Sequence, residues 1–215
     1  LIATVSRNGK LYQQKYSKGK ALADVDEIGT SDHTGTEVFF QPDDTIFQDL
    51  VYNYDTLAAR LRESAFLNKW ITITLTDERN KDENGEPRFE KFHSEGGLKE
   101  FVEYIDGNRE AIMQNVIFME GEKDSIPVEV AMRYNTSYNE NLHSYVNNIN
   151  THEGGTHLAG FRRALTRTLK KFADELGLPA KEKVEVTGDD FREGLTTVIS
   201  VKVMEPQFEG QTKTK

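Results

Sequence analysis

The sequence contains no cysteine. Neither a disulfide framework nor a thiolate zinc site can therefore form, and we expect a reducing, cytoplasmic location. The apolar runs are far shorter than a membrane span, so no membrane-crossing segment is predicted. No internal repeat or low-complexity segment is evident. A length of 215 residues with these absences predicts two globular domains, each with its own core.

Positive charge is in deficit, because 27 lysines and arginines stand against 36 aspartates and glutamates, a formal net charge of −9. Neutralising phosphates needs clustered cations, so the chain is not expected to bind nucleic acid over its whole surface. Any DNA contact should be local. The candidates for such a contact lie on one face of a predicted helix: Arg162, Arg163, Arg167 and Lys170. An equally good alternative is that these side chains form a solvated helix face and pair with nearby carboxylates.

The chain lacks an initiator methionine, and Leu1-Ile2-Ala3 reads like a strand entered midway. Its last residues end without a closing element. We therefore expect both termini to be boundaries within a longer protein.

The front of the chain is predicted to mix strands with one helix. Asn8-Gly9 suits a tight hairpin turn, because both residues tolerate positive φ. Apolar spacing of three and four residues predicts a helix from Tyr54 to about Phe66. The predicted strands flank that turn within 1–16 and continue at 37–40, 71–76 and 88–93, the last two as a hairpin at a sheet edge.

The back of the chain is expected to begin near Gly96, where two glycines interrupt the pattern. A short helix at 98–105 should precede two strands, 127–134 and 141–149, that pair with each other. Thr156 is a plausible N-cap for the longest helix, which Gly177 and Pro179 should end. The helix carries an apolar stripe, and the β-branched run at 195–203 is typical of the middle of a sheet.

Three ordered blocks carry a family resemblance: EGGTHLAGF at 153–161, GDDFREGL at 188–195 and QFEGQTK at 207–213. They resemble the ATPase subunits of bacterial type IIA DNA topoisomerases, gyrase B and topoisomerase IV. The resemblance implies an α+β fold in which residues 1–95 are the C-terminal portion of an Hsp90-like (GHKL) ATPase domain. Residues 96–215 would be a transducer domain resembling domain 2 of ribosomal protein S5 and ending in the Gln-Thr-Lys loop.

The same resemblance implies roles for five residues. Gly35 and Thr36 match the last nucleotide motif of the family, and Arg7 matches an arginine at the rim of the adenine pocket, where aminocoumarin inhibitors bind. Gln211 and Lys213 would lie against the γ-phosphate, and Lys213 is the strongest candidate because its ammonium can neutralise developing charge there. The magnesium-binding asparagine, catalytic glutamate, adenine-reading aspartate and glycine-rich lid of the family precede this chain. ATP with Mg²⁺ is thus expected in the intact subunit, whereas the chain alone should neither bind ATP tightly nor hydrolyse it.

The partners implied are DNA, a gyrase A-type cleavage subunit and a second copy of the subunit, with ATP closing the dimer and hydrolysis releasing the transducer. Two alternatives stay open: a topoisomerase IV subunit that decatenates DNA, and a non-catalytic S5-like interaction module. A mismatch-repair or Hsp90-type ATPase fits less well, because neither should carry the first two blocks.

Other motifs are interpreted as structural. His152 and His157 are five residues apart with two glycines between them, which excludes the zinc-binding helix that their pattern imitates, and no metal site is predicted. Glu153-Gly154-Gly155 is read as a tight turn rather than an anion-binding nest. Asp189-Asp190 is expected to start a short helix clamped by an Arg192–Glu193 pair.

Overall fold

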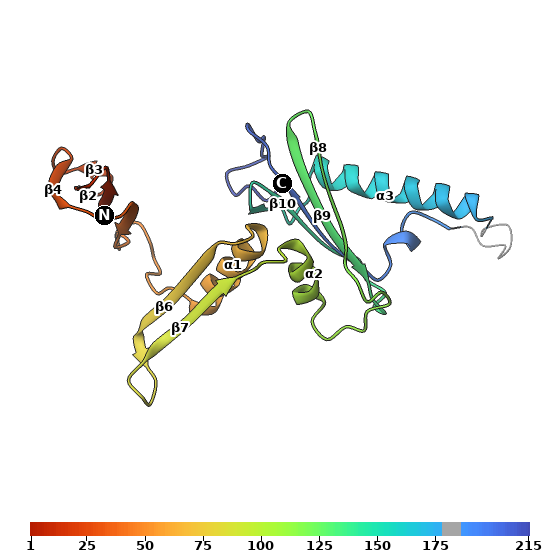
Figure 1. The fold of residues 1–215 in the computed structure, drawn as a ribbon, viewed down its shortest axis with the longest axis horizontal. Helices are drawn as coiled ribbons and strands as arrows, with labels where there is room; N and C mark the ends of the chain where they lie inside the picture. Colours follow the sequence, from red (N-terminus) through yellow and green to blue (C-terminus); the bar gives the residue numbers. More distant parts are fainter. Residues whose placement is uncertain (178–185) are drawn as a thin grey trace. The chain divides into compact units, whose positions relative to one another are not determined.

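The computed structural model describes residues 1–177 and 186–215. They form two compact units, Leu1–Asn53 and Tyr54–Lys215, each with its own β-structure (Figure 1). None of the helices within the described residues is long and apolar enough to cross a membrane.

The first unit is a five-stranded sheet with β1 at its centre. The predicted hairpin is confirmed: β1 (Ile2–Arg7) pairs antiparallel with β2 (Lys10–Ser17) across Asn8 and Gly9, both at positive φ. The strand predicted at 37–40 is also present, as β5 (Gly35–Phe39) on the other side of β1. Two strands on β2 were not predicted from the polar sequence between these elements: β3 (Lys20–Ala21) and β4 (Asp26–Thr30).

The second unit opens with α1 (Tyr54–Leu67), β6 (Thr72–Lys81) and β7 (Pro87–His93). The helix and the hairpin are as predicted, but the hairpin is a two-stranded sheet by itself and not the edge of a larger one. Its inward side chains, including Ile73, Leu75 and Phe92, pack on the buried face of α1. Because α1 covers this face, the two strands need no further strand to bury their apolar side chains.

The main sheet has the order β11-β10-β12-β9-β8. The prediction that 127–134 and 141–149 pair with each other is wrong, because β12 lies between them, antiparallel to β9 and parallel to β10. All seven residues of β12 are buried, as befits a strand at the centre of a sheet that is covered on both faces. The strands are β8 (Ile117–Lys123), β9 (Ile126–Tyr134), β10 (Asn141–Val146), β11 (Ile149–Asn150) and β12 (Leu195–Val201).

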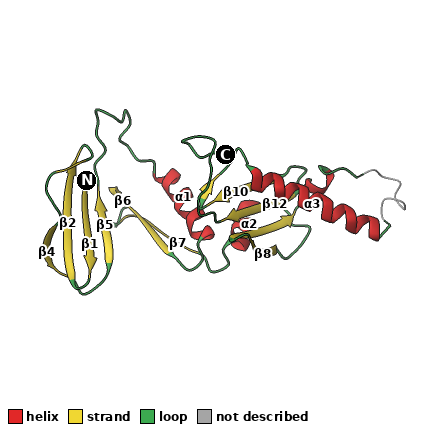
Figure 2. Cartoon of the chain, turned by 90° about the horizontal axis from the view of Figure 1, so that it is seen from above, coloured by secondary structure: helices red, strands yellow, loops and turns green. Residues whose placement is uncertain are grey.

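Two helices cover opposite faces of this sheet (Figures 1 and 2). Val198 of β12 packs with the side chains of α2 (Leu98–Asp106), where Phe101 also stacks on Phe66 of α1 at 5.0 Å. Ile199, the next residue along β12, packs with the side chains of α3 (Thr156–Glu175). Alternate residues of a strand face opposite sides, so the sheet is the middle of three layers.

The start of α3 corrects one prediction. Thr156 is the first helical residue rather than the N-cap, because the carbonyl of Gly155 already accepts the first helical hydrogen bond, from Ala159 at 3.0 Å. The predicted end at Gly177 is confirmed, with φ at 65°, and Pro179 lies outside the described residues. Of the predicted apolar stripe, the first four members pack on the sheet and the last two are exposed: Leu158, Phe161, Leu165, Leu169, then Phe172 and Leu176.

Candidate functional site

Arg7, Gly35 and Thr36 lie together at one end of the first unit's sheet. Gly35 is paired with Ser6, and Thr36 with Val5. Paired residues project on the same face, as do residues two apart on a strand. Arg7 and Thr36 therefore share one face, and both are exposed. The register of β1 with β5 brings these three predicted residues together although Arg7 and Gly35 lie far apart in the sequence.

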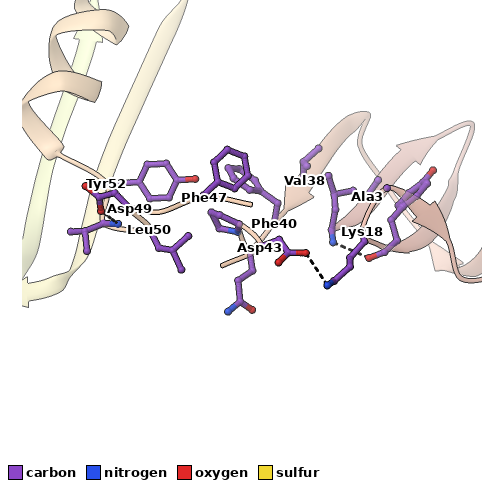
Figure 3. Close-up of a pocket in the computed structure, with 15 residues that line it drawn as sticks. Ala3, Lys18, Val38, Phe40, Asp43, Phe47, Asp49, Leu50 and Tyr52 are labelled. Atoms are coloured by element: carbon purple, nitrogen blue, oxygen red, sulfur yellow. Dashed lines mark hydrogen bonds and ion pairs between the residues drawn. The ribbon is translucent and has the colours of Figure 1, made fainter. Parts of the chain in front are cut away.

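The same face carries an apolar cavity of about 760 Å³. Ala3 is paired with Val38 two positions along from Val5 and Thr36, so this pair also projects on that face. Figure 3 shows Ala3 and Val38 on the sheet side of the cavity and Phe40 and Phe47 along the segment that follows β5. Val38 and Phe40 are more than half exposed. Single exposed apolar residues need no explanation, but a contiguous set marks a surface suited to contact.

Asp43 orders the segment beside this cavity. Its Oδ1 accepts hydrogen bonds from the backbone N–H and the hydroxyl of Thr45, at 2.9 and 2.6 Å. Its Oδ2 lies 3.4 Å from Nζ of Lys18 (Figure 3). The bonds from Thr45, with a smaller contribution from Lys18, lower the pKa of the Asp43 carboxyl below its ordinary value. A carboxylate is thereby held in its charged form at the cavity rim.

Gln211 and Lys213 lie in the second unit, on an exposed turn. The turn is closed by a hydrogen bond from the N–H of Lys213 to the carbonyl of Gly210 at 3.0 Å. Lys213 has a φ of 56°, which is uncommon for a residue other than glycine. Its Nζ lies over the ring of Phe208, 5.6 Å from the centroid, in the range of a cation–π contact. The turn thus presents both predicted side chains at the surface in a defined conformation.

This turn is attached to the start of α3. The hydroxyl of Thr214 donates a hydrogen bond to Oε2 of Glu153 at 2.5 Å. In return, the N–H of Glu153 donates one to the carbonyl of Thr214 at 3.0 Å. The Glu153-Gly154-Gly155 segment is therefore a tight turn, as predicted, in which the N–H of Gly154 bonds to the carbonyl of Thr151 at 2.8 Å. Glu153 itself was not predicted to contact the turn.

His157 belongs to a buried polar cluster. Its Nε2 lies 3.1 Å from Oγ1 of Thr151, which is 2.8 Å from Oγ of Ser144. Burial lowers the pKa of His157 below its ordinary value, favouring the neutral ring. Within residues 1–177 and 186–215, no group of three or more His, Asp or Glu side chains could hold a metal ion.

The four predicted DNA-contact residues differ in their surroundings. Arg162 is held by Glu140 through two hydrogen bonds, at 3.0 and 2.7 Å, so its guanidinium already has a partner. Arg163, Arg167 and Lys170 are exposed on α3, and no hydrogen bond or ion pair engages their side chains among the described residues. Of the four, Arg163, Arg167 and Lys170 therefore present charge to solvent without a partner among the described residues.

The Asp189-Asp190 block is structural in a way that differs from its prediction. A 3₁₀ turn, η1 (Asp190–Arg192), begins there, but Asp189 makes no side-chain cap bond. Arg192 pairs with Asp189 and with Glu140, at 3.3 Å from the latter, instead of clamping Glu193. Hydrogen bonds from the backbone and hydroxyl of Thr187 lower the pKa of Asp190. Arg192 and Arg162 thus share Glu140 and fix η1 against α3.

Comparisons with known proteins all point to one protein family. A family model described as DNA gyrase B matches residues 97–215. The chain is 65% identical over 212 residues to the DNA gyrase B protein of Cytophaga hutchinsonii, covering 99% of this chain and 44% of that protein. It is 52% identical to the DNA gyrase B protein of Clostridium acetobutylicum, covering 98% of this chain and 32% of that protein. The chain therefore spans less than half the length of these curated relatives.

Solved structures agree. The 43K ATPase domain of Thermus thermophilus gyrase B, in complex with an aminocoumarin, matches 97% of this chain and 56% of its own with a TM-score of 0.81 at 32% identity. The topoisomerase IV ATP-binding domain of Francisella tularensis matches 100% of this chain and 57% of its own with a TM-score of 0.77 at 27% identity. These likenesses confirm the predicted α+β fold class and its similarity to GHKL ATPase domains. Because the family model covers more than half of its residues, the chain belongs to the DNA gyrase B family.

Proposed function

We propose that this chain is part of the ATP-binding subunit of DNA gyrase, an ATP-dependent type II topoisomerase, and that it couples the nucleotide state to movement of the DNA gate. The observation that carries the proposal is the exposed turn at 210–213, which presents Gln211 and Lys213 in a fixed conformation at positions matching the family's Gln-Thr-Lys loop. The high identity to gyrase B proteins along the whole chain supports it.

In this proposal residues 1–95 are the C-terminal portion of the ATPase domain and residues 96–215 are the transducer. The start of the family match at residue 97 supports this boundary, as does the pair of glycines, Gly96 and Gly97, immediately before α2. The helix α1 nevertheless belongs to the same compact unit as α2, because Phe66 of α1 stacks on Phe101 of α2.

The side chains suit a triphosphate. Lys213 is a compact point charge and Gln211 adds an amide donor without charge, so together they can stabilise a terminal phosphate. Arg7, Gly35 and Thr36 would contact the adenine end of the nucleotide, and the Thermus relative was solved in complex with an aminocoumarin. Residues of the intact subunit outside this chain would bind the Mg²⁺ and supply the catalytic carboxylate. We therefore expect this chain alone to bind ATP weakly and not to hydrolyse it.

In the proposed mechanism, ATP hydrolysis breaks the interaction between Lys213 and the γ-phosphate. While ATP is intact, Lys213 neutralises charge on that phosphate, and cleavage of the phosphate removes the interaction. The transducer is then free to move. In the intact enzyme, the partners would be DNA, a gyrase A-type cleavage subunit and a second copy of this subunit, with Arg163, Arg167 and Lys170 as the DNA-facing cations.

A supercoiling assay tests this function. The full-length subunit carrying this sequence is mixed with a gyrase A-type subunit and relaxed circular DNA, with and without ATP. Negative supercoils that appear only with ATP support the proposal. Decatenation without supercoiling would assign the chain to a topoisomerase IV-type enzyme, and neither activity would favour a non-catalytic interaction module.

A further inference from the structure

We propose that Glu153 is a positioning residue for Lys213, acting through Thr214. The role in phosphate contact rests on the function proposed above, whereas the attachment of the loop to Glu153 stands on contacts within the second unit alone.

The attachment consists of two hydrogen bonds between the same two residues. The Thr214 hydroxyl donates to Oε2 of Glu153 at 2.5 Å, and the Glu153 N–H donates to the Thr214 carbonyl at 3.0 Å. A bond from a hydroxyl to a carboxylate is charge-assisted and stronger than one between neutral groups. Thr214 is half-buried at this contact, while Lys213 beside it is exposed.

Glu153 is itself fixed to the core of the sheet. Two residues before it, Thr151 is 1% exposed. Its Oγ1 donates to the carbonyl of Ser144 on β10 at 2.9 Å, and its N–H donates to the same carbonyl at 2.8 Å. The N–H of Gly154 then bonds to the Thr151 carbonyl. The Glu153 carboxylate therefore projects from a backbone segment that is hydrogen-bonded to β10 of the central sheet.

Lys213 lies between two anchors. On one side its N–H bonds to the Gly210 carbonyl, and on the other Thr214 is held by Glu153. Its φ of 56° is an unfavourable conformation for a lysine, so it persists only where the neighbouring contacts impose it. Releasing Thr214 would let the backbone relax and change the direction of the Lys213 side chain. Positioning of a charged group contributes to catalysis, because a misplaced group stabilises the transition state less well.

The test applies two measurements to variants of the full-length subunit. Glu153→Ala and Thr214→Val remove the side-chain bond, Thr214→Ser keeps the hydroxyl, and Glu209→Ala is the matched control. Glu209 is a carboxylate in the same loop, paired with Lys215 at 3.0 Å, and its loss leaves the Thr214 bond in place. Amide hydrogen exchange of residues 209–215 without nucleotide reports the attachment. The kcat and KM of ATP hydrolysis, with Lys213→Ala as reference, report its consequence.

We expect Glu153→Ala and Thr214→Val to speed exchange in this segment and to lower kcat about five- to tenfold at nearly constant KM. Thr214→Ser and Glu209→Ala should stay near wild type, and Glu153→Ala combined with Lys213→Ala should be no slower than Lys213→Ala alone. Unchanged exchange would overturn the role of the side-chain bond in this attachment. Faster exchange with unchanged kcat, while Lys213→Ala is slow, would overturn the positioning role. An unaffected Lys213→Ala would instead reject the proposed phosphate contact and leave exchange to judge the attachment.

Discussion

At the level of single residues, Asp106 at the end of α2 is the most buried charged residue among those that the structure describes in the second unit. Its Oδ2 accepts a hydrogen bond from Nε of Arg133 at 2.7 Å, and its Oδ1 accepts one from Asn135 at 3.0 Å. The Asp106 side chain is 0% exposed and that of Arg133 is 11% exposed. Asn135 also donates to Thr196 of β12 at 3.1 Å. This cluster ties α2 to the two central strands.

Removing one member of a buried pair leaves the other charge without compensation, which costs about 3–5 kcal/mol. Asp106→Ala should therefore lower the free energy of unfolding by that amount, measured by urea denaturation followed by circular dichroism. Glu175→Ala is the control, because Glu175 pairs with Lys171 at 3.8 Å on an exposed helix end. Its loss should be below about 0.5 kcal/mol, and equal effects of the two variants would refute the assigned role of Asp106.

Histidine burial predicts a loss of stability in mild acid. Burial lowers the pKa of His157, and of His143 against a smaller opposing effect of Glu63. The unfolded chain takes up these protons near pH 6.5, whereas the folded chain resists them, so stability is complete above about pH 6.5 and falls below it. Carboxylates such as Asp77, whose pKa is lowered to about 2 by Arg79, reduce the stability only in stronger acid, where they become protonated.

We therefore expect the melting temperature to fall between pH 7.5 and pH 5. His157→Gln should make this fall smaller, because a glutamine keeps a polar contact with Thr151 and takes up no proton. His152→Gln, at an exposed position of the same segment, should leave the fall unchanged. An identical pH profile for all three proteins would contradict the role of His157.

At the scale of elements, β12 depends on a glycine at its start. Gly194 has a φ of 70°, and a Cβ there would lie 2.4 Å from the carbonyl oxygen of Asn135. Gly194→Ala should cost at least about 2 kcal/mol of unfolding free energy. Gly160→Ala, inside α3 with open space around it, should stabilise by about 0.5–1 kcal/mol. Thermal unfolding of both variants checks the pair, and the same sign for both would be inconsistent with this packing.

The three uncompensated cations of α3 predict a salt-dependent effect on DNA binding. Each phosphate contact contributes about 0.9 to the slope of log affinity against log salt concentration. In the full-length subunit, Arg163→Ala and Arg167→Ala should each reduce the slope by about that amount, measured by fluorescence anisotropy. Arg162→Ala should change it little, because Glu140 already holds Arg162. A larger effect for Arg162 than for the other two would contradict this assignment.

The local sequence pattern predicted the individual helices and strands better than it predicted which strands pair with each other. Hairpins and helices follow from spacing over a few residues, so β1–β2, α1, α2 and α3 were predictable. The position of β12 between β9 and β10 was not, because the crossover through α3 is decided by which strand is buried on both faces. The strand β8 was missed although Asp124 and Ser125, both at positive φ, form its tight turn to β9. A signal was present there, since Asp and Ser favour turns.

For the molecule as a whole, sequence reasoning proposed candidate residues but not the contacts that hold them. Chemistry and family resemblance make Lys213 a candidate, but neither shows that Thr214 is bonded to Glu153 across 61 positions. The register that places Arg7 and Thr36 on one face of the sheet likewise follows from strand pairing and not from composition. For the arginines of α3, the sequence predicted that they share one face of a helix. It did not predict that Arg162 is paired with Glu140.

In the function proposed above, Lys213 neutralises charge on the γ-phosphate in the intact subunit. The most direct measurement is ATP turnover in the full-length subunit with its cleavage partner, comparing wild type, Lys213→Ala and Lys215→Ala. Lys215 is the matched control, because it lies two residues away and pairs with Glu209 at 3.0 Å. We expect ATP turnover to fall about a hundredfold in Lys213→Ala with the subunit still folded, and to stay near normal in Lys215→Ala. Equal turnover in the two variants would rule out this role of Lys213.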